Sequence, residues 1–422
     1  MKEKIQLPPQ ILLIILFCGG LFVSPGFSNP APEKDDREHL LLRAGFGLPS
    51  GKTDFNASTR NGLVGELLKS ARTKALIEIP QRLLSPVAEP GTIQGMSREE
   101  KKDLRMERRK RGEELKAWWL REMVLTDSPI TERMTLFWHN HFTSSLKKVK
   151  FPALMARQNQ VLRKYALGSF SQMLLEIAHD PAMILYLDGQ RNQKRKPNEN
   201  FARELLELFT LGEGHYTEKD IKEAARAFSG HKVDRRSGEF HFAPRRHDHG
   251  LKVFLSQRGR WIGEDIISIL LDHPQTSLHI TAKLWKEFVS LPLPEALLGE
   301  LAGVFRDSGY SISSLLEKIL NSEQFWSEEN RGNSIKSPVE LVVSTLRGIE
   351  FETADYSRLV KLCRRLGQDL LDPPSVKGWM GGKTWINTYT LLLRQQALRR
   401  LVKRFPEHRM TASFMEPEWQ LK

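Results

Sequence analysis

Two histidines lie two positions apart in a segment that is otherwise rich in aromatic residues. His139 and His141 flank Asn140 and follow Phe137 and Trp138. A histidine buried beside aromatic rings has a pKa that its surroundings can move around neutrality, which suits general acid–base catalysis. Residues two apart on a helix point about 200° apart, so these two cannot bind one metal ion there. We therefore take both histidines as candidate catalytic residues, with hydrogen-bonded packing as the alternative.

A second polar pattern lies in the segment 197–212. The sequence predicts a helix that Asn198 caps and Gly212 ends. A polar stripe at helical spacing runs along it, made of Asn200, Arg203, Glu204 and Glu207. Arg203 is one turn from Glu199 and Glu207, so we expect both carboxylates to hold its guanidinium. We predict a catalytic carboxylate and an anion-binding arginine among Glu199, Arg203 and Glu204, with substrate contacts from Asn198 and Asn200. The alternative is an amphipathic core helix with a solvated face.

The best local pattern for a metal site is His247-Asp248-His249. In an extended segment, residues two apart lie on the same side, and imidazole binds zinc, copper or iron. The alternative is a solvated loop beside Arg245 and Arg246, whose charge opposes cation binding. The spacing of Glu176 and His179 also matches one half of a di-iron motif, but the motif occurs only once. We interpret that occurrence as chance.

Two further residues are candidates for substrate binding. Lys252 follows the histidine loop, and Trp379 lies in a segment with several helix breakers, 372–382. The tryptophan could be a stacking lid or a core residue, and the sequence leaves both open. No glycine-rich phosphate loop and no nucleophile-elbow motif is present, which argues against nucleotide-binding and α/β-hydrolase folds.

The chain is strongly basic, with 64 Lys and Arg against 51 Asp and Glu and a net charge of +13. The excess is clustered, and residues 98–111 hold eight basic and four acidic side chains, which we interpret as a solvated helix. Such a balance favours an anionic polymer or substrate. Aromatic residues are not interleaved with the basic ones, which argues against nucleic acid.

The first 28 residues have the pattern of a secretory signal peptide. Lys2 and Lys4 precede an apolar run of 13 residues from Ile11 to Val23, and Gly26-Phe27-Ser28 forms a small-x-small cleavage site. We predict export to the periplasm or the medium and no transmembrane span in the mature chain, with a retained N-terminal anchor as the alternative. Removal of Cys18 leaves Cys363 as the one cysteine, so neither an internal disulfide nor a cysteine-ligated zinc site is possible.

The periodicity of apolar residues predicts a mainly α protein: a large multi-helix globular domain with one small β-hairpin insertion near residues 231–255. We expect an N-terminal helical lobe over 29–230 and a C-terminal helical lobe over 256–422 that ends in a basic helix. Ser128-Pro129 and the Thr217/Asp220 capping box mark two helix starts.

Several separated blocks occur in order between residues 38 and 404: Leu42–Gly47, Met134–Phe142, Pro197–Gly212, Tyr216–Glu218, His247-Asp248 with Gly250 and Lys252, Ser337–Glu340 and Pro373–Trp379. Together they resemble one family of exported bacterial proteins, the domain-of-unknown-function 1800 family. His249 departs from the family pattern, where a small or acidic residue is more usual. The resemblance implies a helical exported protein and, as a partner, a co-exported protein of the domain-of-unknown-function 1501 family.

Two functions are consistent with these patterns. The first is an envelope or secreted enzyme acting on an anionic substrate, with its site assembled from the histidine pair, the 197–212 stripe and His247-Asp248. A divalent metal ion is its candidate cofactor. The second is a non-catalytic exported binding or scaffold protein, whose basic surface holds an anionic polymer or the co-exported partner. The enzyme requires that the distant blocks meet at one pocket, whereas the binding protein requires only a contiguous basic surface.

Overall fold

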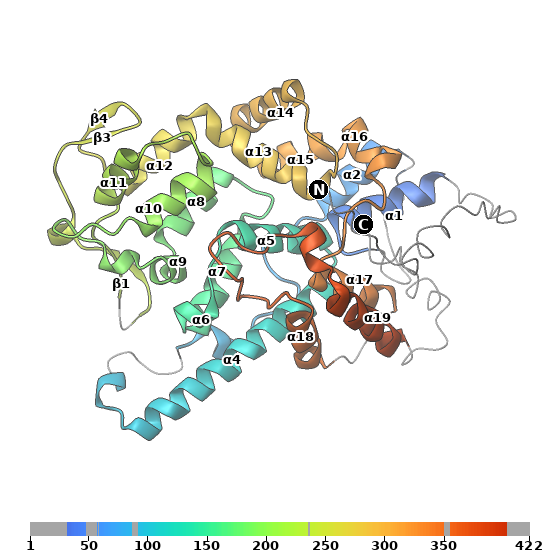
Figure 1. The fold of residues 1–422 in the computed structure, drawn as a ribbon, viewed down its shortest axis with the longest axis horizontal. Coiled ribbons are helices and arrows are strands. Elements are labelled where there is room, and N and C mark those ends of the chain that lie inside the picture. The colour runs from blue at the N-terminus through green and yellow to red at the C-terminus, as the bar shows by residue number, and fades with distance from the viewer. Residues whose placement is uncertain are drawn as a thin grey trace, which may run out of the picture.

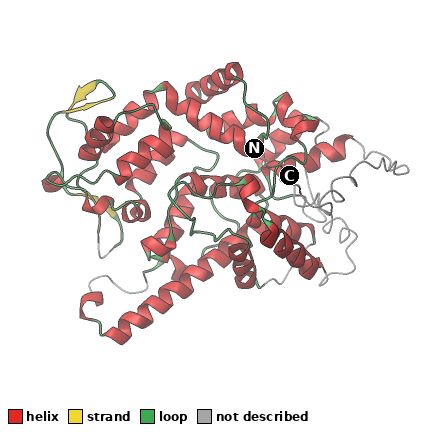
Figure 2. Cartoon of the chain, in the orientation of Figure 1, coloured by secondary structure: helices red, strands yellow, loops and turns green. Residues whose placement is uncertain are grey.

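The computed structural model describes residues 32–47, 57, 59–86, 92–234, 237–349 and 355–402. The predicted signal peptide and the end of the basic C-terminal segment lie outside the described residues. The described chain is mainly α-helical, as the sequence predicts (Figure 2). Among the described helices, none combines the length and the apolar character needed to cross a membrane.

The first part of the chain consists of helices of very different lengths. They are α1 (Pro32–Ala44), α2 (Arg60–Lys69), α3 (Gln81–Leu84), α4 (Arg98–Leu125), α5 (Pro129–His141), α6 (Leu146–Val149), α7 (Pro152–Lys164), α8 (Phe170–His179), α9 (Pro181–Tyr186), α10 (Asn200–Glu204) and α11 (Glu218–Ala227). A π-helical turn, Leu205–Thr210, directly continues α10. Pro129 begins α5 as predicted, and the capping box of Thr217 and Asp220 begins α11.

The predicted β insertion is present, and it is followed by a second hairpin. Strands β1 (His231–Val233) and β2 (Phe240–Phe242) form one antiparallel pair, and β3 (Lys252–Phe254) and β4 (Gln257–Gly259) form another. Leu255 and Ser256, the two turn residues of the second hairpin, both have positive φ values, 45° and 66°. Glycine or asparagine normally occupies such a turn, so this hairpin has no turn signal in the sequence.

The remainder of the chain is again helical. It contains α12 (Gly263–Asp272), α13 (Pro274–Phe288), α14 (Glu295–Asp307), α15 (Ile312–Leu320), α16 (Glu323–Trp326), α17 (Pro338–Gly348), α18 (Tyr356–Arg365) and α19 (Thr388–Val402). Short 3-10 turns lie at Thr92–Gly95, Gly189–Arg191, Pro244–Arg246, Glu328–Asn330 and Gly382–Trp385.

Segments far apart in sequence share one hydrophobic core, which includes residues from Leu40 to Leu371. Helix α4 packs against α17 and α18, while α5 packs against α7 near the centre of the molecule (Figure 1). Helices α8 to α12 and both hairpins lie together on one side of the view in Figure 1. The division into two lobes therefore stays a prediction, because core contacts connect the segments on either side of residues 231–255.

Helix α4 shows how local sequence sets one of these elements. Ser97 accepts a hydrogen bond from the backbone of Glu100, whose carboxylate accepts one from the backbone of Ser97, and this capping box begins the helix. Its second half buries Trp118 and Trp119. Its basic first half projects beyond the body of the molecule (Figure 1). Basic side chains therefore extend along α4 from its exposed first half to its buried second half.

Candidate functional site

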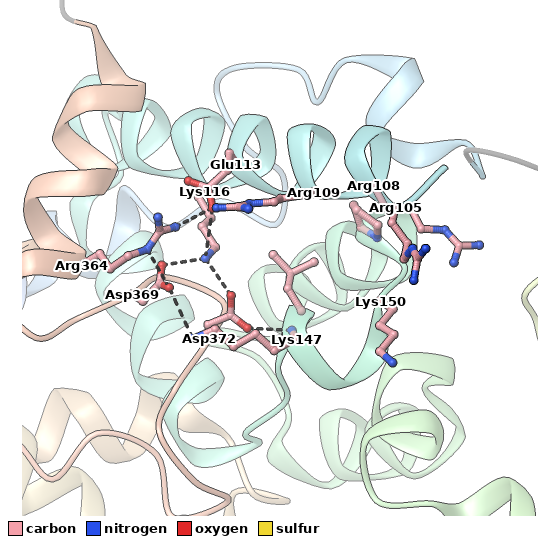
Figure 3. A pocket seen from close by; sticks show the side chains of 13 residues that line it. Arg105, Arg108, Arg109, Glu113, Lys116, Lys147, Lys150, Arg364, Asp369 and Asp372 are labelled. Carbon is pink, nitrogen blue, oxygen red and sulfur yellow. Dashed lines mark hydrogen bonds and ion pairs between the residues drawn. The ribbon is translucent and has the colours of Figure 1, made fainter. Parts of the chain in front are cut away.

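A pocket of about 540 Å³ lies between α4, α6 and the segment that follows α18 (Figure 3). Seven cationic and three acidic side chains line it, which makes it strongly basic. The cations are Arg105, Arg108, Arg109, Lys116, Lys147, Lys150 and Arg364, and the acids are Glu113, Asp369 and Asp372. Gly112, Leu146 and Pro152 complete the lining.

The acids gather at one end of the pocket, around Lys116 (Figure 3). The Lys116 side chain is only 2% exposed, and its Nζ donates to Asp369 Oδ1 at 2.6 Å and to Asp372 Oδ2 at 2.8 Å. Arg364 donates to Glu113 at 2.5 Å and pairs with Asp369 at 2.8 Å. Each of the three acids of the pocket therefore has at least one cationic partner.

The opposite end contains cations without acidic partners (Figure 3). The guanidinium of Arg108 lies 4.5 Å from the ring centre of Phe151, and burial lowers its pKa. Its Nε and Nη2 are buried and have no hydrogen-bond partner among the described residues. Arg105 and Lys150 line the same end, and neither forms an ion pair with a described residue. This end of the pocket therefore offers donors to an anion.

Lys150 occupies an unusual backbone position for a lysine. It ends α6 in the left-handed region, with φ 65° and ψ 7°. This conformation costs a residue with a β-carbon about 1–2 kcal/mol, and glycine or asparagine is the usual choice there. The local fold thus holds an ammonium group at the pocket at some cost in stability.

The predicted catalytic residue His139 lies in the core behind the pocket. It is 1% exposed, and its ring contacts Trp119 at 5.5 Å and Trp379 at 6.0 Å. Burial, with a smaller effect of Lys116, lowers its pKa to about 4. Its Nε2 has no hydrogen-bond partner among the described residues. His139 is therefore a neutral imidazole enclosed by aromatic rings.

His141 points to a different aromatic group. It is 5% exposed and lies 5.5 Å from Trp138 and 5.8 Å from Phe209. Its Nδ1 accepts a hydrogen bond from Lys283 Nζ at 3.1 Å. Burial, followed by the charge of Lys283, holds the pKa of His141 well below its usual value. Burial also lowers the pKa of Lys283, to about 8.

The helix of residues 197–212 differs from its prediction at its start and in its middle. Helix α10 begins at Asn200, one residue later than predicted, and Asn198 Oδ1 accepts a hydrogen bond from the Asn200 backbone N–H at this helix start. At Leu205 the backbone widens into the π-helical turn, which changes the predicted spacing of the stripe. Gly212 ends the segment with φ 82°, as expected.

Arg203 has other partners than the sequence suggested. It pairs with Glu199 at 3.3 Å, as predicted, but its second partner is Glu218 of α11 at 2.7 Å. The predicted partner, Glu207, pairs instead with Lys377. The prediction that Glu199 and Glu207 hold the guanidinium is therefore only half right. Arg203 is 36% exposed and fastens α10 to α11, and it does not line the basic pocket.

Glu204 lies half-buried one residue further on. Burial and then the charge of Glu207 raise its pKa. The charge of Glu204 contributes, after burial, to the raised pKa of Tyr186, and Asp372 of the pocket contributes as well. Glu204 thus lies near Tyr186, and no hydrogen bond joins its side chain to a described residue.

The segment 372–382 connects the pocket with the histidine helix. The backbone N–H of Trp379 donates to Asn140 Oδ1 at 2.7 Å, and Asn140 Nδ2 donates back to the Trp379 carbonyl at 3.3 Å. Gly378 has φ 75°, and a β-carbon there would lie 2.2 Å from Asn140 Oδ1. Trp379 is 7% exposed and acts as a core residue against His139.

The predicted metal residues lie elsewhere, at the C-terminal end of α11. Both oxygens of Asp248 accept hydrogen bonds from Arg226, at 2.8 and 3.2 Å. His247 is buried with Nδ1 against the Ser229 carbonyl, and His249 Nε2 faces the Pro244 carbonyl. No hydrogen bond joins this loop to His139, His141 or Glu204 in the described part of the chain. These three ligand candidates are therefore engaged in structural contacts.

Lys252, predicted to bind substrate, is fully buried. Its Nζ donates to the Asp248 carbonyl at 2.5 Å and to the Gly250 carbonyl at 3.2 Å. It closes the loop that contains His247 and is not open to a ligand. Asn200 is exposed on the surface of α10, away from the pocket lining.

The sequence contained a signal for the basic pocket that its interpretation as a solvated helix did not use. The run 98–111 supplies Arg105, Arg108 and Arg109, and five residues beyond this run Lys116 is buried among acids. A lysine in the middle of the apolar second half of a helix requires a buried partner. Nothing local identifies that partner as Asp369 or Asp372.

The comparisons with known proteins identify a family and no individual relative. The model of a family described as "Protein of unknown function (DUF1800)" matches residues 39–420. No curated protein and no solved structure matches the chain.

Proposed function

The chain belongs to the DUF1800 family, and we propose that it is an exported protein that binds an anionic ligand in its basic pocket. The export half of the proposal rests on the signal-like pattern of residues 1–28. The ligand half rests on the pocket between α4, α6 and the segment after α18. Phosphate, sulfate and carboxylate groups are the chemical class that such a pocket fits.

Arg108 carries this proposal. Two of its nitrogens are buried without a hydrogen-bond partner among the described residues, and a buried donor left unsatisfied costs about 1–3 kcal/mol. Both nitrogens are covered in the free protein, so the guanidinium has to turn away from the Phe151 ring before an anion can bind them and remove this cost. A guanidinium presents two parallel N–H groups to a phosphate or carboxylate, in a geometry that lysine cannot reproduce.

The charge balance around Arg108 supports the same conclusion. Lys116, Lys147 and Arg364 together balance the charges of Glu113, Asp369 and Asp372. Arg105, Arg109 and Lys150 then add positive charge that no described acid compensates. The strained backbone at Lys150 supports the same proposal, because such strain is typically retained where a side chain binds a ligand.

The size of the pocket limits what enters it. A volume of about 540 Å³ lies within the range of small-molecule sites, so it suits a small anion or one unit of an anionic polymer. A co-exported protein of the DUF1501 family stays a proposed partner, with an acidic segment of that protein as the contact.

These observations favour binding over catalysis at this pocket. Neither His139 nor His141 lines it, and both are buried as neutral imidazoles. The acids of the pocket are held in ion pairs and are not available as general bases. The binding alternative therefore has more support from the geometry than the enzyme has.

Isothermal titration calorimetry with inorganic pyrophosphate tests the proposal. Charge-assisted hydrogen bonds contribute about 1.5–3 kcal/mol, so Arg108→Leu should weaken binding about tenfold or more. Lys150→Asn should weaken it as well while keeping the fold, because asparagine tolerates positive φ. Lys219→Gln removes the same charge from the exposed face of α11 and serves as the control.

Two results would contradict the proposal. The first is pyrophosphate binding that Arg108→Leu and Lys150→Asn leave unchanged. The second is an equal loss in Lys219→Gln, because it would show that the anion responds only to the net charge of the protein.

A further inference from the structure

We propose that His179, His231 and Glu264 form a binding site for a divalent transition-metal ion, with Zn²⁺ as the best match. His179 is the last residue of α8, His231 the first of β1, and Glu264 lies in the first turn of α12. None of the three lines the basic pocket, so this site is independent of the proposed anion binding.

The geometry brings one donor atom from each side chain into a small volume. These three atoms all lie within 4.8 Å of one another. His179 Nε2 and Glu264 Oε1 are 2.8 Å apart. Zinc–ligand distances of about 2.0–2.2 Å place two ligand atoms of a tetrahedral ion roughly 3.4 Å apart. Small side-chain rotations therefore complete the site, and Glu264, with 42% of its side chain exposed, is free to make them.

The two imidazole rings are held in place by aromatic neighbours. Phe240 stacks on His179 with ring centres 4.4 Å apart and meets the edge of His231 at 5.0 Å. Phe228 packs edge-on against His231 at 5.4 Å. A β-carbon on Gly263 would lie 2.6 Å from the Phe228 ring and 3.2 Å from His231 Cε1. Glycine therefore allows the start of α12 to approach both rings closely.

A hydrogen bond between the buried His231 ring and the Ala178 backbone orients the imidazole, as carbonyl groups commonly do for metal-binding histidines.

The donor set and its exposure indicate the type of site. Two imidazoles and one carboxylate are the ligands of His₂Glu zinc centres, which keep a further position for water or a substrate oxygen. His179 and Glu264 are partly exposed, 25% and 42% of their side chains, so that position faces solvent. His231, 4% exposed, anchors the buried side.

The His247-Asp248-His249 loop is the alternative metal site, and its contacts argue against it. Asp248, between His247 and His249, is occupied by Arg226, whose positive charge opposes a cation there. Glu176, the acid of the Glu-x-x-His pattern, instead lies 3.4 Å from Tyr165 Oη. The acidic ligand beside His179 is therefore Glu264, and not Glu176 as the spacing in the sequence would suggest.

The experiment is a titration of the full chain with Zn²⁺ by calorimetry after removal of metal with a chelator. We expect one equivalent of Zn²⁺ to bind with a micromolar or lower Kd and to raise the melting temperature. Co²⁺ should give visible absorption bands of a four- or five-coordinate ion. Glu264→Gln should weaken Zn²⁺ binding at least 100-fold.

Glu264→Gln is the main variant because its side chain is partly exposed and its loss leaves the fold intact, which a melting curve in chelator verifies. His231→Ala should also abolish binding. His249→Ala removes an exposed histidine of the competing loop and should leave the Kd unchanged. Weaker than millimolar Zn²⁺ binding, an unchanged Kd in Glu264→Gln, or an equal loss in His249→Ala would each overturn the proposal.

Discussion

Replacement of Lys116 by methionine isolates the energy of the ion cluster at the inner end of the basic pocket. The substitution keeps the apolar stem and removes the ammonium group that bridges Asp369 and Asp372 at 2.6 and 2.8 Å. It leaves two carboxylates, 12% and 5% exposed, without their common partner. Removal of one partner of a buried ion pair typically costs about 3–5 kcal/mol.

Remaining contacts place the expected loss at the lower end of that range. Asp369 keeps Arg364 Nε at 2.8 Å. Asp372 Oδ1 keeps two donors at 2.8 Å, the Ser145 hydroxyl and the backbone N–H of Lys147. We therefore expect Lys116→Met to lower the free energy of unfolding by about 3 kcal/mol. Denaturation in urea at pH 7 measures it.

Lys147→Met is the matched control. Lys147 Nζ lies 3.8 Å from Asp369 Oδ2, but its side chain is 73% exposed. Solvent screens this pair, so its loss should change the free energy of unfolding by at most about 1 kcal/mol. Adding Asp369→Asn and Asp372→Asn to Lys116→Met should restore part of the stability, because the uncompensated charges are then removed. Equal losses in Lys116→Met and Lys147→Met would refute this account of the cluster.

Three further predictions follow from single features of the structure. Gly378→Ala should cost about 3 kcal/mol because its β-carbon meets Asn140, whereas Gly309→Ala, with a similar φ of 69° and open space, should cost about 1–2 kcal/mol; equal losses in urea denaturation would contradict the contact. Burial lowers the pKa of four histidines to about 4: His39, His139, His231 and His279. The unfolded chain therefore binds more protons than the folded protein between pH 6.5 and 4. The free energy of unfolding should fall by about 1 kcal/mol per histidine when the pH is lowered from 7.5 to 5.5. Asp180, whose pKa burial raises to about 7, opposes this trend with the reverse sign, and unfolding curves that do not change over that range would contradict the assignment of neutral histidines. Arg203→Lys should change the free energy of unfolding by less than about 1 kcal/mol and leave pyrophosphate binding unchanged, because Arg203 joins α10 to α11 at the surface. Loss of pyrophosphate binding in this variant would show that Arg203 takes part in anion binding.

The sequence alone determined the helical class of the protein and most of its punctuation. The capping box of α11, the start of α5 at Pro129 and the positive φ of Gly212 all appear where residue types predict them. Each of these features depends on contacts within about four residues, which a sequence contains in full. The turn at Leu255 and Ser256 could not be predicted in this way, because both residues have positive φ values that their residue types disfavour.

Only the tertiary structure decided which side chains meet. Lys116 pairs with acids more than 250 positions away, and Arg203 selects Glu218 over the nearer Glu207. His179, His231 and Glu264 come from three elements that no spacing rule connects. The physical reason is that ion pairs and metal groups form where packed helices bring charges together, and the packing depends on the whole apolar core. The sequence therefore predicted the elements and their polar residues, and the fold chose the partners.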